Sequence, residues 1–265
     1  MTSDRAGPQR LSARDNPLLV RLRRLAQDST AYRRAGQAWI EGEHLCAALC
    51  TRGLPAAQAV ITEAGWGDTA LRTLAGHAAR VAIVPAALFK AASGLESPAQ
   101  LGFVIDLPSP SPLLSRVPSV VLDRVQDAGN VGSILRSAAA FGVVQVLALK
   151  GTAALWSPKV LRAGMGAHFG LRLVEGLDET GLDALDLPLV ATSSHAGSVL
   201  PQAALPAGAA WVLGHEGQGV SPALLQRCAL QVRIPQPGGE ESLNVAAAAA
   251  ICLYESARRA TRSGQ

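Results

Sequence analysis

The sequence predicts an α/β protein built from two α/β domains. Three observations carry this prediction: short apolar runs alternate with amphipathic helical runs along the chain, one stretch rich in Pro and Ser interrupts the alternation, and 49% of the 265 residues are hydrophobic. Uninterrupted apolar strands between amphipathic helices are typical of a mainly parallel sheet that is covered on both faces. A chain of this length is comfortable for two domains with buried cores.

The first domain is expected over residues 1–105. It begins with a helix over 17–34, in which Asn16 can cap the first turn and Pro17 suits the first helical position. Leucines spaced three and four residues apart give this helix an apolar stripe, formed by Leu18, Leu22 and Leu25. The later elements are strands over 37–43, 58–64, 81–85 and 101–107, and helices over 44–53, 71–80 and 85–92.

Residues 106–118 hold four prolines and three serines, a composition that favours an extended linker. The second domain is therefore expected over residues 119–265. Its strands are predicted over 119–125, 143–150, 171–175, 187–194, 209–214 and 231–235, and its helices over 130–142, 157–167, 221–228 and 243–260. Ligands of such sheets bind at the carboxyl ends of the strands, so the loops there are the candidate sites.

Basic residues are concentrated in the first domain. Residues 1–105 contain 12 basic and eight acidic residues, whereas residues 106–265 contain 12 of each. Arginine forks bind phosphate well, so Arg21, Arg23 and Arg24 on the first helix are candidate contacts to an anionic partner. A solvated charged face explains the same pattern equally well.

Several other classes of protein are disfavoured. No run of about 18 or more uncharged apolar residues occurs, which argues against a membrane span. The first 17 residues lack the apolar core of a signal peptide, and their two aspartates argue against an organelle transit segment, so we expect a cytoplasmic protein. Four cysteines without a CxxC pair indicate reduced thiols. No metal site is expected, because His44 and Cys46, which with Cys50 are the candidate ligands, face different sides of their helix.

Polar residues follow the strand predicted over 119–125 and lead into the helix over 130–142. Asn130 is expected to cap this helix. Arg136 is harder to explain, because it lies two turns into a helix that is otherwise small and apolar. Its side chain either reaches solvent along the helix edge or has a functional role.

A second loop, Gly-His-Glu-Gly-Gln-Gly at 214–219, follows the strand over 209–214. Its glycines permit positive φ angles and a close approach of the backbone to a ligand. The spacing matches neither the dinucleotide-binding fingerprint nor a Walker motif. A plain turn explains the glycines but not Glu216, which lies among them.

A third loop, IPQPGGEES at 234–242, precedes the last helix. Ser242 is expected to cap this helix, and the apolar run 245–253 to pack it against the sheet. The cap leaves Asn244 unexplained, because an apolar residue would serve as well at that position.

These three loops resemble motifs 1, 2 and 3 of the SpoU/TrmH family of SPOUT-class RNA methyltransferases, in the family's order and approximate spacing. The matching residues are Asn130 and Arg136 in motif 1, Gly214, Glu216 and Gly217 in motif 2, and Ile234, Ser242, Leu243 and Asn244 in motif 3. The first domain is similar to the family's ribosomal-protein-like substrate-binding domain, notably in NPLLVRLRRL and AWIEGEHL. One departure is the motif 3 turn, which carries Pro237 and two acidic residues.

The resemblance implies a fold and a cofactor that residue patterns alone do not give. The second domain would contain a deep trefoil knot, and S-adenosylmethionine would bind in it between the loops of motifs 2 and 3. The enzyme would be a homodimer with the site at the subunit interface. The residues that would bind the cofactor are Gly214, Gly217, Ile234 and Leu243, with Thr192 and Ser193 at another strand end as further candidates.

The implied reaction is methyl transfer to a ribose 2′-hydroxyl of structured RNA, which needs no metal. Arg136 would either act transiently as a base or stay charged, hold the RNA phosphate and stabilise the developing alkoxide; guanidinium chemistry favours the second role. Asn130 would position Arg136 or the ribose, and Glu216 would anchor its loop or orient Asn130. Ser242 and Asn244 would hold the substrate phosphate or the residues of motif 1.

Alternatives to this interpretation stay open at the level of sequence. The folded first domain favours ribosomal RNA over transfer RNA as the substrate, and the basic helix would contact it. A non-catalytic RNA-binding or ribosome-assembly protein, an enzyme that methylates a base nitrogen and a nucleotide-dependent oxidoreductase are the rival hypotheses.

Overall fold

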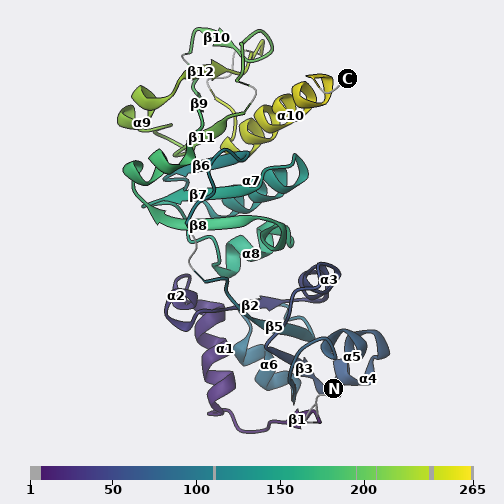
Figure 1. Ribbon diagram of the computed structural model, residues 1–265. Helices are drawn as coiled ribbons and strands as arrows, with labels where there is room; N and C mark the ends of the chain where they lie inside the picture. The colour runs from purple at the N-terminus through teal and green to yellow at the C-terminus, as the bar shows by residue number, and fades with distance from the viewer. Residues whose placement is uncertain (1–6, 110–111, 195, 207, 239–241, 264–265) are drawn as a thin grey trace. The chain divides into compact units, whose positions relative to one another are not determined.

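The computed structural model describes residues 7–109, 112–194, 196–206, 208–238 and 242–263 (Figure 1). The chain forms two compact units. Unit 1 consists of Met1–Ser109 and Trp156–Phe169, and unit 2 of Pro110–Leu155 and Gly170–Gln265. Both units are α/β, as the alternating pattern predicts.

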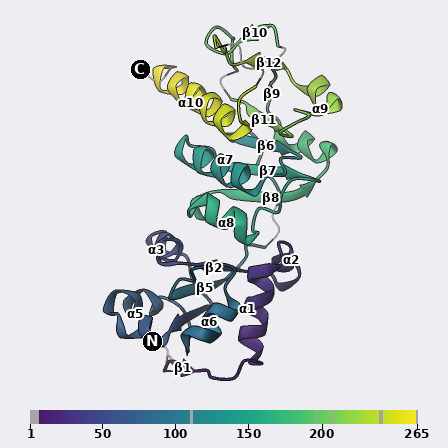
Figure 2. The ribbon, with the colours of Figure 1, turned by 180° about the vertical axis from the view of Figure 1, so that it is seen from behind.

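Unit 1 contains a five-stranded mixed sheet with strand order β1-β4-β3-β5-β2. Strands β1, β3 and β4 are parallel, and β5 runs antiparallel to β3 and β2. Helices α1 and α6 lie on one face, and α3 and α5 on the other (Figures 1 and 2). The elements are β1 (Gln9–Arg10), α1 (Pro17–Gln27), α2 (Ala31–Ala35), β2 (Gln37–Glu41), α3 (Glu43–Thr51), β3 (Gln58–Thr62), α4 (Glu63–Gly67), α5 (Thr69–Ala75), β4 (Val81–Val84), α6 (Ala86–Ala92), β5 (Leu101–Asp106) and α8 (Pro158–Gly164).

The helix predicted over 17–34 is two helices. Asn16 caps α1 as expected, since its side chain accepts a hydrogen bond from the Leu18 N–H. The helix ends at Gln27, because the Asp28 carboxylate accepts hydrogen bonds from both the N–H and the hydroxyl of Thr30. Such a local turn competes with the helical hydrogen bonds, so α2 starts separately at Ala31.

Residues 156–169 belong to unit 1, although they follow β7 of unit 2 in the chain. Helix α8 packs against the edge strand β2 and against α1. Leu161 is 2% exposed and is part of the apolar core of unit 1, where Trp156 and Phe169 pack against it. The span 119–265, expected as the second domain, thus includes a segment that is buried in the first unit.

Unit 2 contains a seven-stranded sheet in which every paired strand is parallel, with the order β10-β12-β9-β11-β6-β7-β8. This confirms the predicted, mainly parallel sheet. The elements are β6 (Ser119–Asp123), α7 (Ala128–Ala140), β7 (Gln145–Leu149), β8 (Arg172–Leu177), η2 (Glu179–Leu185), β9 (Leu189–Thr192), β10 (Ser198–Val199), β11 (Ala210–Gly214), α9 (Pro222–Arg227), β12 (Leu230–Arg233) and α10 (Val245–Ser263), and η1 (Ala167–Gly170) lies where the chain passes between the units.

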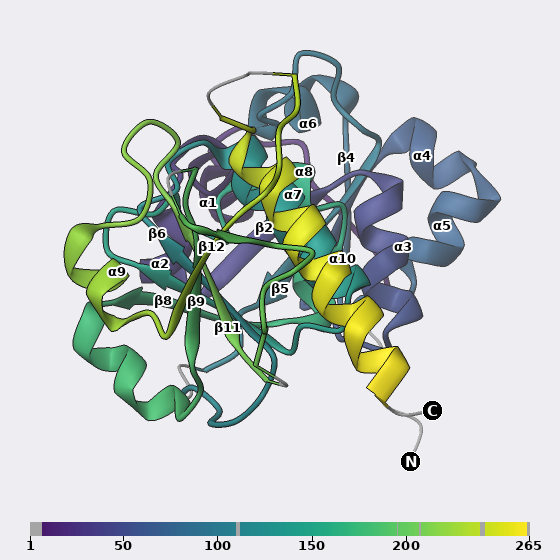
Figure 3. The same ribbon diagram turned by 90° about the horizontal axis from the view of Figure 1, so that it is seen from above.

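Helices cover both faces of this sheet. Helices α7 and α10 lie side by side on one face, and α9 and η2 lie on the other (Figures 1 and 3). Ile134, Leu135 and Leu253 are buried on the α7–α10 side. Buried apolar strands between two helical layers explain why the strands read as continuous apolar runs.

Three further observations concern membrane-spanning helices, metal sites and disulfide bonds. No helix in the described part of the chain is long and apolar enough to cross a membrane. The described residues hold no group of three or more His, Cys, Asp or Glu side chains arranged to bind a metal ion. All four cysteines are free thiols.

Candidate active site at the carboxyl end of the sheet

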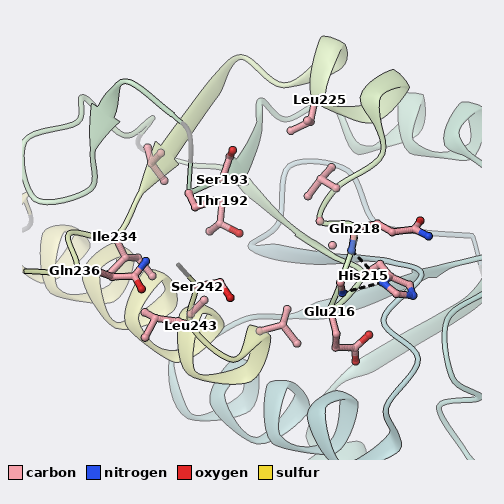
Figure 4. A pocket seen from close by; sticks show the side chains of 18 residues that line it. Thr192, Ser193, His215, Glu216, Gln218, Leu225, Ile234, Gln236, Ser242 and Leu243 are labelled. Carbon is pink, nitrogen blue, oxygen red and sulfur yellow. Dashed lines mark hydrogen bonds between the residues drawn. The ribbon is translucent and has the colours of Figure 1, made fainter. Parts of the chain in front are cut away.

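The carboxyl ends of three neighbouring strands of unit 2, β12, β9 and β11, surround a cavity of about 380 Å³. Its wall comes from the chain after β9, the loop after β11 and the segment between β12 and α10 (Figure 4). Eight of the residues singled out in the sequence line it: Thr192, Ser193, Gly214, Glu216, Gly217, Ile234, Ser242 and Leu243. Three others, Asn130, Arg136 and Asn244, lie outside its wall.

The loop 214–219 is a closed turn. His215 and Gly219 exchange main-chain hydrogen bonds of 3.0 and 2.8 Å, and Gly219 has a φ of +69°. A Cβ atom on Gly214 would lie 2.1 Å from the main-chain carbon of Gly219, so only glycine fits there. The His215 Nδ1 atom accepts hydrogen bonds from the Gly217 and Gln218 N–H groups, which gives this histidine a structural role (Figure 4).

Glu216 ties this loop to the loop after β6. Its carboxylate accepts hydrogen bonds from the N–H groups of Gln126 (3.1 Å) and Asp127 (3.0 Å) and from the Asn130 Nδ2 atom (3.0 Å). Partial burial raises the pKa of the Glu216 carboxyl, but these hydrogen bonds outweigh it and lower the pKa to about 2. At neutral pH Glu216 is therefore an ionised acceptor.

Asn130 links motif 1 to motif 3 as well. Its Oδ1 atom accepts a hydrogen bond of 2.9 Å from the Asn244 Nδ2 atom. Because Glu216 can only accept, the Asn130 amide must turn its NH₂ group toward Glu216 and its oxygen toward Asn244. The chain Glu216–Asn130–Asn244 thus joins the segments that follow β11, β6 and β12.

The helix caps differ from those expected at both motifs. Asp127, not Asn130, caps α7, since its carboxylate accepts a 2.7 Å hydrogen bond from the Asn130 N–H. Asn244, not Ser242, caps α10, because its Oδ1 atom accepts from the N–H groups of Ala246 (2.9 Å) and Ala247 (3.2 Å). The Asn130 side chain therefore does not act as a cap, and Asn244 caps α10 with its oxygen alone. The Asn130 oxygen and the Asn244 NH₂ group can thus bond to each other.

Arg136 lies on the exposed side of α7. Within the described residues it makes no hydrogen bond or ion pair, and it does not line the cavity. A helix rises about 1.5 Å per residue, so eight residues place Arg136 about 12 Å along the axis from the start of α7. The single chain therefore brings Asn130, Glu216 and Asn244 together, but not Arg136.

Two residues of the site are not evident from the sequence. Gln236 lines the cavity, and among the described residues its buried Oε1 atom has no hydrogen-bond partner. Asp127 caps α7, and its spacing of three residues from Asn130 is a signal that could have found it. No pattern singles out Gln236, because it lies in an irregular turn.

The candidate RNA-binding arginines lie on α1 of unit 1. Arg24 is exposed, whereas Arg21 and Arg23 are half-buried. Arg23 donates a hydrogen bond to the carbonyl oxygen of Arg14.

A parallel α/β sheet with a glycine-lined pocket at the carboxyl ends of its strands defines an enzyme of the class that binds small organic cofactors there. A family model described as the SpoU rRNA Methylase family matches residues 118–254, which is more than half of the chain. The chain belongs to this family of methyltransferases.

Individual relatives extend this comparison. The chain is 34% identical over 171 residues to the Bacillus subtilis "23S rRNA (guanosine(2553)-2′-O)-methyltransferase RlmP", covering 63% of this chain and 68% of that protein. It is 39% identical over 144 residues to the "23S rRNA (guanosine-2′-O-)-methyltransferase RlmB" of Bordetella pertussis, 53% of this chain, and so spans 59% of that relative's length. A crystal structure titled "RNA 2′-O ribose methyltransferase" matches 96% of this chain and all of that chain at 30% identity, with a TM-score of 0.77.

Proposed function

We propose that this protein transfers a methyl group from S-adenosylmethionine to a ribose 2′-hydroxyl in ribosomal RNA. One observation carries the proposal: Glu216, Asn130 and Asn244 hydrogen-bond three strand-end loops to one another beside the cavity. The names of the relatives support the reaction and the class of RNA.

The cavity fits a small cofactor. Its volume of about 380 Å³ is within the range of pockets that bind small molecules. Its wall combines glycine backbone with apolar side chains, and the unpartnered Gln236 Oε1 atom suits a donor such as an amino group. The residues that would hold the cofactor are Thr192, Ser193, Gly214, Gly217, Ile234 and Leu243. When bound, the cofactor supplies a methyl group on a sulfonium, which is a good leaving group and needs no Lewis acid.

The residues of this chain then have to orient the reacting groups, and the proton released from the 2′-hydroxyl passes to solvent water at the exposed rim of the cavity. Glu216 keeps its charge at neutral pH and acts as an anchor, not as a proton carrier. It fixes the Asn130 amide, which presents its second N–H to the ribose or to its phosphate. Ser242 is exposed at the rim of the cavity, where its hydroxyl can hold a phosphate oxygen. Holding the 2′-hydroxyl in line with the methyl group supplies much of the catalysis.

Arg136 completes the site from a second copy of the chain. Together α7 and α10 expose a stripe that includes Ser133, Arg136 and Ala140 on α7 and Ile251 and Tyr254 on α10. Ile251 is 39% and Tyr254 55% exposed, so the stripe carries two large side chains that a second subunit would cover. We place the homodimer interface on this stripe, so that Arg136 reaches the cavity of the partner subunit. There it stays charged, binds the RNA phosphate and stabilises the developing alkoxide.

A trefoil knot in unit 2 is part of the same proposal. After β9 the chain passes to the edge strand β10, returns to β11 between β9 and β6, and then leaves again to β12 between β9 and β10. Such a return path supports a threaded chain of the kind that the family resemblance implies. Tracing the path in a crystal structure decides the point, because a chain that straightens when both ends are pulled contradicts the knot.

RNA binding is assigned to unit 1, with Arg21, Arg23 and Arg24 as phosphate contacts. Reversing the charge of all three should weaken RNA binding and reduce its dependence on salt. RNA affinity that is unchanged after this substitution would remove these arginines from the interface. We also propose that the protein is cytoplasmic, as expected from its sequence.

The test is methyl transfer to RNA that lacks the modification. Ribosomal and transfer RNA from cells without the gene are incubated with the enzyme and methyl-labelled S-adenosylmethionine, and the nucleosides are separated by mass. We expect label in a 2′-O-methyl nucleoside of ribosomal RNA. Label on a base, or in transfer RNA alone, would contradict the proposed reaction or substrate.

A further inference from the structure

Arg124 has an unusual backbone at the end of β6. Its φ is +60°, a conformation that is sterically unfavourable for a side chain of this size. Its N–H donates a 3.1 Å hydrogen bond to the Thr152 hydroxyl, which in turn donates to the Leu122 carbonyl oxygen at 3.0 Å. Surrounding structure therefore holds Arg124 in this conformation, as is typical of residues with a functional role.

The guanidinium of Arg124 pairs with a buried carboxylate, that of its neighbour Asp123. Asp123 is 2% exposed. Its Oδ1 atom accepts from the Arg124 Nε atom at 2.9 Å, and its Oδ2 atom accepts from the Arg124 Nη2 atom at 3.3 Å and from the Ser221 N–H at 2.6 Å. A buried carboxylate needs such partners, so Asp123 fixes both Arg124 and the residue that caps α9.

The same guanidinium also reaches the glycine-rich loop. Its Nη1 atom donates a 2.9 Å hydrogen bond to the Gln218 Oε1 atom, and Gln218 lines the cavity (Figure 4). The Asp123–Arg124 pair thus holds the 214–221 segment at Gln218 and at Ser221. Glu216 holds it independently, through the loop after β6.

We infer that Asp123 and Arg124 form a clasp that fixes the 214–221 segment and so shapes the cofactor cavity before any ligand binds. Neither residue lines the cavity, so both are positioning residues. The inference rests on the proposed function, because it names positioning residues for the same cavity. An arginine suits this position better than a lysine, since a planar fork serves Asp123 and Gln218 at once, whereas a lysine offers a single point charge.

The test compares Arg124→Gly with a matched control, Arg116→Gly. Arg116 also has a positive φ, of 59°, and pairs with Asp186 at 2.5 Å, but it lies outside the cavity wall. Both variants relieve the backbone and remove an ion pair. Hydrogen exchange of residues 214–221 is measured without ligand, and S-adenosylmethionine binding is measured by calorimetry.

We expect Arg124→Gly to speed exchange in this segment and raise the cofactor Kd, each about tenfold, which corresponds to the loss of one charge-assisted hydrogen bond. The KM for the cofactor rises similarly while kcat stays within about twofold. Arg116→Gly behaves as wild type, and Arg124→Lys is intermediate. Gln218→Ala, a change at an exposed side chain, keeps the result decisive if Arg124→Gly does not fold, because it must show the same faster exchange in the ligand-free protein.

The clasp is overturned if Arg124→Gly and Arg116→Gly show the same exchange in residues 214–221 or the same cofactor Kd. If Arg124→Gly does not fold, equal exchange in Gln218→Ala and Arg116→Gly overturns it. Failure of the wild-type protein to bind S-adenosylmethionine is a separate outcome that overturns the proposed function. The exchange measurement on the free protein still decides the clasp in that case.

Discussion

The side chain of Glu216 accepts three N–H donors from the loop after β6 and the first turn of α7. Only an ionised carboxylate accepts at both oxygens, whereas a glutamine would turn its own NH₂ group toward one of the donors. The residue therefore suits an anchor between two loops. The same hydrogen bonds favour the ionised form and lower the pKa of Glu216 to about 2 in the folded protein.

The stabilisation from Glu216 should depend on pH. Because folding lowers its pKa from 4.5 to about 2, the contribution is complete above about pH 5 and is lost as the pH falls through 2. We expect Glu216→Gln to be less stable than wild type at pH 7 and the difference to shrink at pH 2.5, as measured by urea unfolding. Glu255, whose pKa is also about 2, is present in both proteins and cancels. A difference that stays constant across this range would contradict the assignment.

Asn244 has two functions that substitutions can separate. Asn244→Asp keeps an oxygen that accepts from Ala246 and Ala247 but sets it against the Asn130 oxygen. We expect this variant to keep its stability and lose most of its methylation activity. Asn244→Ala should lose the activity and also about 1 kcal/mol of stability, the usual value of a helix cap. An active Asn244→Asp protein would show that the contact with Asn130 is dispensable.

The sequence singled out residues that the structure brings together, but not the helix caps beside them. Loop composition and family motifs found Asn130, Glu216 and Asn244, whereas the caps were assigned to Asn130 and Ser242. Several polar residues near a helix start can each serve as its cap, and the choice depends on where a second partner lies. Asn130 has such partners 86 and 114 residues away in sequence, which no local pattern contains.

At the scale of elements, α7 and α10 pack side by side and share an exposed stripe that includes the large side chains of Ile251 and Tyr254. Arg136 lies on this stripe and not in the cavity of its own chain. A site shared between two subunits accounts for both observations.

A shared site makes a specific prediction for mixed dimers. Arg136→Ala and Glu216→Gln should each be nearly inactive as homodimers. A heterodimer, purified with two different tags, contains one cavity with an intact Glu216 that faces an intact Arg136 of the partner subunit. We expect it to regain up to half of the wild-type activity. A heterodimer as inactive as its parents would place Arg136 in the site of its own chain.

Element types followed from the sequence better than element boundaries. Apolar runs located the long strands, and amphipathic runs located most helices. The two-residue strands β1 and β10 were missed, because they exist only through pairing with β4 and β12. Helix α4 was not predicted, and its first two residues were assigned to the strand over 58–64, since its start depends on one hydrogen bond from the Gly65 N–H to the Thr62 hydroxyl.

At the scale of the whole molecule, the chain passes between the two units three times, after residues 109, 155 and 169. Segment 156–169 supplies Leu161 to the core of unit 1. Contacts between residues so far apart in the sequence produce no local sequence pattern. The sequence therefore assigned residues 156–169 to the second domain, together with their neighbours in the chain.

This arrangement predicts that unit 1 depends on a helix from beyond the linker. Leu161→Ala should lower the free energy of unfolding by about 2–5 kcal/mol, as expected for a leucine removed from a core. Lys159→Ala, an exposed change in the same helix, should have almost no effect. Chemical unfolding of both variants measures this, and equal stabilities would mean that α8 is peripheral to unit 1.

The central claim is that the loops after β9, β11 and β12 form one cofactor pocket. Calorimetric titration of S-adenosylmethionine into wild-type, Gly214→Ala and Gly197→Ala proteins tests it most directly. A Cβ on Gly214 collides with the loop backbone, whereas a Cβ on Gly197 meets no atom within 4 Å. The account predicts one site per chain in the wild type, at least tenfold weaker binding in Gly214→Ala and unchanged binding in Gly197→Ala. Absence of binding in the wild type, or equal affinity in all three proteins, would contradict it.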